Sequence, residues 1–257
     1  MLTQEQEILV SAAVERGLNR AEGAWQSVGK QLITKASTTF DHAILAEQAK
    51  PSSIPGHPWV SDSNPIVDEF VALVVDMRNS SEHLKSRRAS PVIEYGFQRV
   101  FYETSALLPA ISVTCGFNSG VVTEYLGDGA LVLFRVNIED REETIREAYR
   151  AAKHCIGQTR DIVNRHLEGR YKLPPIHVGA GLAMSKALIS LVGDDNDSQP
   201  KAIGECVWEA TKLSGGVNAV YVSVPLYEAW PVSKGGKLRF LKASTNSVEG
   251  YKVASAA

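Results

Sequence analysis

The stretch Phe70-Val71-Ala72-Leu73-Val74-Val75-Asp76 decides the fold of this chain. It is short, apolar and rich in β-branched residues, which predicts a buried strand that ends at a carboxylate. A second signal is the pair of apolar runs 121–127 and 130–136 around Gly127-Asp128-Gly129, which predicts a hairpin. Each signal therefore places one aspartate, Asp76 or Asp128, at the end of an apolar strand.

The remaining elements follow from side-chain periodicity. Ser90-Pro91 supplies an N-cap and a first-turn proline, which predicts a helix from there to about Leu108. Further helices are expected over 145–169 and 205–213, and further strands over 176–184, 187–192, 219–224, 238–242 and 250–253. The order β-α-β-β-α-β followed by extra elements predicts an α/β (α+β) domain of the ferredoxin-like kind.

The chain divides into three predicted parts. Residues 1–50 are expected to be a helical segment, in which Leu18, Trp25 and Leu32 form part of a short apolar seam. Residues 51–65 are rich in Pro, Ser, Gly and Asp and predict a linker. The main domain is expected to span 66–257.

Composition excludes several classes of protein. A formal net charge of −2 gives no basic footprint for nucleic acid. The three cysteines have no metal-ligand spacing and suit a reducing compartment. No stretch approaches the ~18 apolar residues of a membrane span, and the N-terminus lacks the pattern of a secretory signal. We therefore expect a cytoplasmic protein with no nucleic acid and no membrane among its partners.

Asp76 and Asp128 are the candidate metal ligands. In the split topology the first strand lies beside the hairpin, so both carboxylates can reach one edge of the sheet. Two close carboxylates repel unless a cation bridges them, and Mg²⁺ needs only one or two carboxylates plus substrate phosphates. The alternative is that Asp76 caps a turn and Asp128 serves the hairpin bend.

Four stretches, taken in order, resemble the class III nucleotidyl cyclases: Phe70–Ser80, Glu124–Phe134, Val178–Gly193 and Ile203–Leu213. The resemblance implies a nucleoside triphosphate substrate and two Mg²⁺ or Mn²⁺ ions per active site. It implies Asp76, Asp128 and the Met77 carbonyl as metal ligands. It also implies binding of the β- and γ-phosphates by the backbone amides of Arg78, Asn79, Ser80 and Ser81. Lys242 occupies the place of the family's phosphate-binding lysine, although a solvated lysine at a strand end fits it equally well.

Two positions depart from the family members that use purines. Those members carry a base-binding lysine four residues before the second metal aspartate and an aspartate before the catalytic helix, where this chain has Glu124 and Lys201. This exchange of donor and acceptor favours the pyrimidine cyclases of the Pycsar anti-phage system. Resemblance to that branch in overall layout, and no particular residue, implies UTP in preference to CTP and a product-sensing effector protein as partner. Tyr125 and Trp208 are candidates to fill the space around a smaller base. The alternatives are a surface pair between Glu124 and Lys201, and an adenylate or guanylate cyclase.

A third departure lies in the predicted catalytic helix. The family's asparagine and arginine correspond to Trp208 and Lys212, which share one helical face at a spacing of four. Lysine supplies the positive charge but not a planar bidentate fork, while Trp208 either stacks on a base or packs. Because class III sites form between two catalytic domains and this chain has one, the resemblance implies a homodimer. The competing hypothesis is a degenerate cyclase-like module that dimerises or senses nucleotide without turnover.

A basic cluster precedes Ser90-Pro91 and contains His83, Lys85, Arg87 and Arg88. We expect it to be a solvated helix face, with a phosphate or dimer contact as the alternative.

Overall fold

The computed structural model of the 257-residue chain describes residues 49–194, 197–232 and 236–255, together with Gly23 and Ser27. The predicted N-terminal helical segment and its apolar seam therefore lie almost wholly outside the described residues. The chain forms two compact units: Met1–Glu69 with Lys186–Gly204, and Phe70–Ser185 with Glu205–Ala257.

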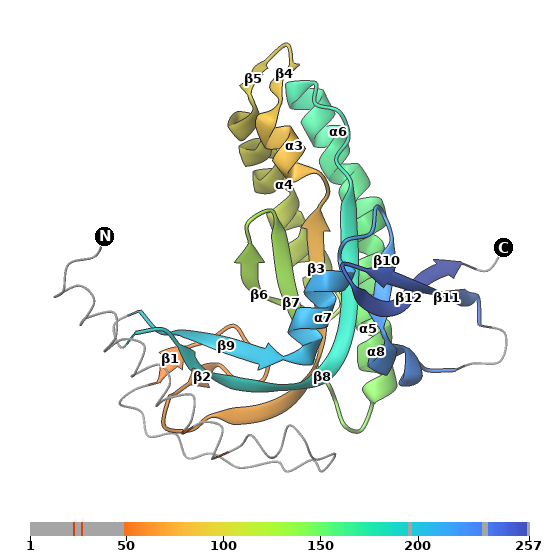
Figure 1. Ribbon diagram of the computed structural model, residues 1–257. Helices are drawn as coiled ribbons and strands as arrows, with labels where there is room; N and C mark the ends of the chain where they lie inside the picture. Colours follow the sequence, from red (N-terminus) through yellow and green to blue (C-terminus); the bar gives the residue numbers. More distant parts are fainter. Residues whose placement is uncertain (1–22, 24–26, 28–48, 195–196, 233–235, 256–257) are drawn as a thin grey trace. The chain divides into compact units, whose positions relative to one another are not determined.

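The larger unit is built on a mixed sheet (Figure 1). Its strands, in sheet order, are β11 (Leu238–Thr245), β12 (Val248–Ser255), β10 (Val220–Ser223), β8 (Val178–Val192), β3 (Ile66–Met77), β7 (Gly129–Arg135) and β6 (Val121–Leu126). β3 pairs antiparallel with β7, β7 antiparallel with β6, and β8 parallel with β10. The order β8-β3-β7-β6 is the ferredoxin-like order, so the predicted fold class is confirmed.

Three long helical segments cover one face of this sheet: α4 (Gly96–Gly116), α5 (Arg141–His154) and α6 (Arg160–Tyr171). A π-helical turn, Cys155–Thr159, joins α5 to α6 and contains the non-helical Gly157. The alternate residues Val71, Leu73, Val75 and Met77 of β3 pack in one buried cluster with α4 and α5. Because side chains alternate along a strand, Asp76 faces the opposite side of the sheet.

The helix α7 (Glu205–Leu213) lies on that opposite side. A Cβ on Gly181 of β8 would come within 2.1 Å of the Ala210 carbonyl oxygen, and one on Gly179 within 2.0 Å of the Ser214 carbonyl oxygen. Both glycines alternate with Val178, Ala180 and Leu182, which face the helices α4 to α6. The absence of side chains at these two positions therefore lets α7 approach the sheet on the face that carries Asp76. The short helix α8 (Val224–Glu228) follows β10.

The described residues of the smaller unit contain two strand pairs. β1 (Lys50–Pro51) pairs with β2 (Trp59–Val60), and β9 (Gln199–Gly204) pairs with residues 187–192 of β8. The interval expected to be a linker is partly ordered by these contacts. His57 Nε2 lies 2.8 Å from an Asp68 carboxylate oxygen, and Lys50 Nζ donates to the Ser198 carbonyl at 2.9 Å.

Two element predictions are wrong. The helix expected from Ser90-Pro91 begins instead at Gly96 and ends at Gly116. Residues 87–95 form a small hairpin, β4 (Arg87–Ser90) with β5 (Ile93–Tyr95), and Pro91 lies in its turn, where the Ser90 hydroxyl accepts the Val92 N–H at 3.3 Å. The strands expected at 176–184 and 187–192 are a single strand, β8, and its antiparallel partner is β9. Among the described residues, no helix has the length and apolar character required to cross a membrane.

Candidate functional site

The two candidate aspartates lie at the same end of neighbouring strands. Asp76 is directly opposite Gly129, and Asp128 is the residue before Gly129 at the tip of the hairpin. A Cβ on Gly129 would lie 2.8 Å from Asp76 Oδ1 and 2.8 Å from the Val75 carbonyl oxygen. Gly127, on the other side of Asp128, has a φ of 69°, a conformation that glycine adopts without steric cost. The glycines therefore allow the hairpin tip to approach Asp76 and bring Asp128 to the same edge.

Arg78 neutralises this acidic edge from within the chain. Its Nη2 forms an ion pair with Asp76 Oδ2. Burial lowers the pKa of the Arg78 guanidinium from its ordinary value, while the negative charge of Asp128 acts in the opposite direction. Arg78 Nε is buried without a hydrogen-bond partner. The Arg78 guanidinium thus interacts electrostatically with both carboxylates, and its Nε–H has no hydrogen-bond acceptor.

The residues present fit the binding of divalent cations. Two carboxylates at one strand edge, with the Met77 carbonyl between Asp76 and Arg78, form an all-oxygen donor set of the kind that Mg²⁺ and Mn²⁺ prefer. The described residues contain no cluster of three or more His, Cys, Asp or Glu that could hold a metal ion. Two carboxylates and one carbonyl would leave part of the coordination shell of such an ion open.

A turn with candidate phosphate donors follows Asp76 directly. Asn79 adopts a left-handed conformation, with φ 62°, and precedes the helix α3 (Ser80–Lys85). The Arg78 N–H is already donated to the His177 carbonyl at 2.8 Å, so it does not contribute to an anion-binding turn. The Asn79 side chain makes no capping hydrogen bond, which leaves the amides of Asn79, Ser80 and Ser81 as the candidate phosphate donors.

A β-bulge in β6 places the side chains of Glu124 and Val122 on opposite faces of the sheet. The pairing of β6 with β7 shifts between Val122, opposite Val132, and Glu124, opposite Leu131. Val132 belongs to the buried cluster under α4 and α5, so Leu131, its neighbour in the strand, faces the other way. Thr123 is the extra residue, and it lets Val122 face the helices while Glu124 shares the sheet face of Asp76.

Tyr125 and Lys201 are placed differently. Tyr125 is opposite Ala130 and therefore lies on the face of α4 and α5, at the edge strand and 56% exposed. Because Glu124 and Tyr125 face opposite sides, Tyr125 is not part of the candidate site. Lys201 lies on β9 of the smaller unit, opposite Ser190, whereas the acidic edge belongs to the larger unit.

The predicted catalytic helix forms at the predicted residues. Cys206, Ala210 and Leu213 are its buried face, whereas Trp208 is 56% exposed and is not a core residue. Lys212 is partly exposed, and its carbonyl accepts a hydrogen bond from Asn246 Nδ2 at 2.8 Å. In the part of the chain described, no hydrogen bond or ion pair joins Trp208 or Lys212 to Asp76, Asp128 or Arg78.

A buried polar cluster beside the turn was not predicted from the sequence. Glu103 on α4 is fully buried and lies 2.8 Å from both His83 Nδ1 and Arg99 Nε. His83 is therefore not part of a solvated face, whereas Lys85 at the end of α3 is exposed as expected. Arg87 and Arg88 are exposed too, but they lie on the strand β4 and not on a helix. The available signal was the spacing of Glu103 with Leu107 and Ile111, which places a carboxylate on the buried stripe of the helix.

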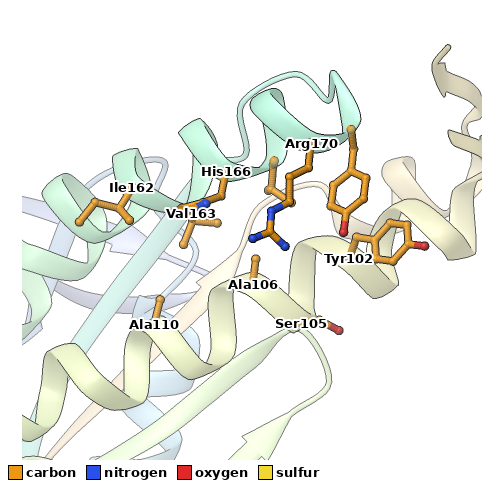
Figure 2. A pocket seen from close by; sticks show the side chains of 10 residues that line it. Tyr102, Ser105, Ala106, Ala110, Ile162, Val163, His166 and Arg170 are labelled. Atoms are coloured by element: carbon orange, nitrogen blue, oxygen red, sulfur yellow. The ribbon is translucent and has the colours of Figure 1, made fainter. Parts of the chain in front are cut away.

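A separate groove lies between α4 and α6 (Figure 2). It has a volume of about 340 Å³ and includes the small residues Ala106 and Ala110 on α4 and the side chains of His166 and Arg170 on α6. At one end Tyr102 and Tyr171 stack in parallel with their ring centroids 4.3 Å apart. None of the predicted site residues lines this groove, so it is distinct from the acidic edge.

No protein-family model and no curated protein sequence matches this chain. Solved structures do match. The adenylyl cyclase CyaB from P. aeruginosa is 13% identical and covers 76% of this chain and 97% of its own, with a TM-score of 0.61. The guanylyl cyclase Cya2 is 17% identical, with coverages of 75% and 94% and a TM-score of 0.58. The guanylate cyclase domain of RhGC from Catenaria anguillulae, solved with GTP, is 13% identical, with coverages of 76% and 100% and a TM-score of 0.53. The chain has the fold of a class III cyclase catalytic domain.

Within this class III cyclase fold, one predicted phosphate ligand lies far from the others. Lys242 is on β11, and three strands separate β11 from β3 in the sheet. Because neighbouring strands are about 4.8 Å apart, β11 and β3 are separated by roughly 19 Å. Lys242 is 73% exposed, and its Nζ lies 3.7 Å from a Glu249 carboxylate oxygen. A single chain therefore does not bring Lys242 to Asp76 and Asp128.

Proposed function

We propose that this chain is a nucleotidyl cyclase that converts a nucleoside triphosphate to a 3′,5′-cyclic nucleotide and pyrophosphate. The observation that supports this most is the pair Asp76 and Asp128 at one strand edge, followed directly by the turn at Asn79. The fold alone does not carry the activity, because the matched structures are 13–17% identical to this chain. The proposal therefore rests on the acidic edge within that fold.

Each residue has a definite task in the reaction. The ribose 3′-oxygen attacks the α-phosphorus, the bond to pyrophosphate breaks, and the 3′-hydroxyl proton is released. Divalent cations at Asp76, Asp128 and the Met77 carbonyl would lower the pKa of that hydroxyl and neutralise phosphate charge. The amides of Asn79, Ser80 and Ser81 donate to the terminal phosphates, as anion-binding turns do. Lys212 contributes positive charge near the α-phosphate.

The complete site is proposed to need two chains. The strand β11, which carries Lys242, is roughly 19 Å from β3 within one chain. A lysine that binds the same triphosphate must therefore come from a second copy. A two-fold homodimer supplies it twice, because each chain offers both the acidic edge and the lysine.

For the base we propose a pyrimidine, with UTP preferred over CTP. The support is the acceptor Glu124 and the donor Lys201 at positions where purine-using cyclases have the opposite types, and the shared facing of Glu124 and Asp76. A site built to bond one base edge discriminates strongly against another, because mismatched buried groups are left unpaired. The preference for UTP and a product-sensing effector in anti-phage defence rest on resemblance to the pyrimidine cyclases alone.

The direct test incubates the purified chain with equal concentrations of ATP, GTP, CTP and UTP and with Mn²⁺, and separates the products by chromatography. Cyclic UMP or cyclic CMP as the main product is expected. Dominant cyclic AMP or cyclic GMP would refute the pyrimidine preference and keep the cyclase. No cyclic product from any of the four would refute the cyclase itself.

A second candidate is a nucleotide-sensing module without turnover. Two observations favour it: Trp208 stands where the family has an asparagine, and Arg78 is ion-paired with the proposed metal ligand Asp76. Such a module would bind a nucleoside triphosphate in equilibrium dialysis and return it unchanged.

A further inference from the structure

The helix α3 has no apolar anchor of its own. It spans six residues, Ser80–Lys85, none of which is buried, and its one large apolar side chain, Leu84, is 53% exposed. Isolated helices of this length are unstable in water. Contacts with the rest of the chain must therefore fix α3, and with it the turn at Asn79.

The side chain that reaches from α3 into the interior is His83. Its Nδ1 lies 2.8 Å from Glu103 Oε2 on α4. In the tautomer that carries a proton on Nδ1, His83 donates to this oxygen, because a carboxylate accepts hydrogen bonds. The second Glu103 oxygen, Oε1, accepts from Arg99 Nε at 2.8 Å, one helical turn earlier on α4. Glu103 is 0% exposed and thus has both oxygens engaged inside the protein.

The backbones of α3 and α4 also meet directly. A Cβ on Gly96, the first residue of α4, would lie 1.9 Å from the Leu84 carbonyl oxygen and 2.7 Å from that of His83. The Ser86 hydroxyl donates to the same His83 carbonyl at 2.6 Å. Side-chain and backbone contacts therefore converge at His83, within one helical turn of Asn79.

We propose that Glu103, oriented by Arg99 and acting through His83, is a positioning residue for the triphosphate-binding turn Asn79–Ser81. This inference rests on the proposed function for the identity of the ligand. Glu103 and Arg99 act on neither the acidic edge nor the turn amides directly; they hold α3 at the angle that presents those amides beside Asp76. The buried carboxylate of Glu103 thus acts on the substrate site only through His83 and α3.

The test uses three substitutions on α3. His83→Ala removes the donor, His83→Asn retains a donor at the place of Nδ1, and Leu84→Ala is the matched control on the exposed side of the same helix. Hydrogen exchange of a peptide covering 79–86 reports the attachment of α3 without any ligand. Calorimetry with Mn²⁺ and inorganic tripolyphosphate reports phosphate binding, and steady-state kinetics with the preferred nucleotide report KM and kcat separately.

We expect His83→Ala to speed exchange in 79–86 and to weaken tripolyphosphate binding by about tenfold each, because a buried hydrogen bond to a carboxylate is lost. KM should rise in parallel while kcat falls much less, and His83→Asn should restore most of each loss. Leu84→Ala should behave as the wild type.

Two results would overturn the proposal: unchanged exchange and tripolyphosphate binding in His83→Ala, or equal losses in His83→Asn and His83→Ala. Absence of cyclic product from the wild type, together with the expected exchange and tripolyphosphate results, would refute the cyclase and retain the positioning role. A second variant, Glu103→Met, removes both acceptor oxygens and keeps an unbranched side chain of similar length. It should speed hydrogen exchange in 79–86 at least as much as His83→Ala does. Its melting temperature should show that the protein is still folded.

Discussion

Asp76 and Asp128 share one cationic neighbour, Arg78, at the edge where they meet. Asp76→Asn or Asp128→Asn should reduce cyclisation at least ~100-fold, because each carboxylate positions a cation that carries transition-state charge. The measurement is cyclic nucleotide formed per minute with Mn²⁺, at matched protein concentration and with the melting temperature recorded. Asp161→Asn, on the exposed start of α6, is the control and should keep the wild-type rate. Near-normal turnover by both site variants would contradict the assignment of the two aspartates.

Arg78 should compete with divalent cations for the acidic edge. Because its guanidinium forms an ion pair with Asp76, removing it leaves two carboxylates that repel each other and bind a cation more tightly. Arg78→Met should therefore tighten Mn²⁺ binding by about fivefold, which corresponds to the ~1 kcal/mol of a partly exposed ion pair. Titration of free Mn²⁺ by electron paramagnetic resonance measures this without any turnover. Arg165→Met on α6 serves as the control, and weaker Mn²⁺ binding by Arg78→Met would show that Arg78 supports the cation site.

The residues of the site were partly visible in the sequence. Asp76 and Asp128 were predicted because each follows an apolar strand, and the sheet brings both to one edge. The contact of His83 with Glu103 was not, because it joins residues twenty positions apart on two helices. The bulge at Thr123 was also invisible, since a one-residue shift in pairing leaves no mark on residue type.

At the scale of elements, α7 contains a carboxylate whose ionisation opposes folding. Partial burial is the main cause that raises the pKa of Glu209, and the charge of Glu205 adds to it, while a hydrogen bond with Ser223 acts in the opposite direction. When folding raises the pKa of a carboxyl group, the free energy of unfolding falls as the pH rises from the pKa in the unfolded state through the pKa in the folded state. Glu209→Gln should therefore raise the melting temperature at pH 7.5.

That gain should disappear below the ordinary glutamate pKa of 4.5, where the carboxyl group is protonated in both states. Differential scanning calorimetry at about pH 7.5 and about pH 3.5 makes the comparison, with the exposed Glu168→Gln on α6 as the control. A gain of equal size at both pH values would mean that packing, and not charge, is the cause.

Elements with one clear period were predicted well, and elements set by long-range pairing were not. The helix 205–213 forms over the predicted residues because its apolar positions recur at helical spacing. The predicted strands 176–184 and 187–192 leave Ser185 and Lys186 between them, yet β8 runs through these two residues. The Ser185 hydroxyl accepts the Cys206 N–H at 2.8 Å, so a polar residue is satisfied in mid-strand by a partner that the local sequence does not reveal.

At the scale of the whole molecule, the proposed site can be tested by mixing inactive chains. Asp76→Asn lacks the acidic edge and Lys242→Ala lacks the distant lysine, so each should be nearly inactive alone. Mixed dimers contain one site in which both residues are native. After exchange of subunits, activity should return to about a quarter of the wild-type rate, since half of the dimers are mixed and each has one intact site.

Light scattering on each variant and on the mixture checks that all samples are dimers. The control mixes Asp76→Asn with Asp128→Asn, which share one edge and should not complement. A monomeric wild type with full turnover, or complementation by the control pair alone, would exclude a site formed by Lys242 of one chain and the aspartates of another.

The bulge at Thr123 divides β6 into two stretches whose side chains are assigned to the faces of the sheet independently. The pairing next to the hairpin tip determines which face of the sheet Glu124 and Leu126 point to. The pairing farther along β7 determines the face of Val121 and Val122. Deleting Thr123 would place Glu124 directly after Val122 in regular alternation and leave both on their present faces. Deleting a residue between Glu124 and the tip would instead move Glu124 to the other face or shift the tip itself. A lineage of such domains can therefore change its length by one codon at position 123 while every side chain of the acidic edge keeps its place.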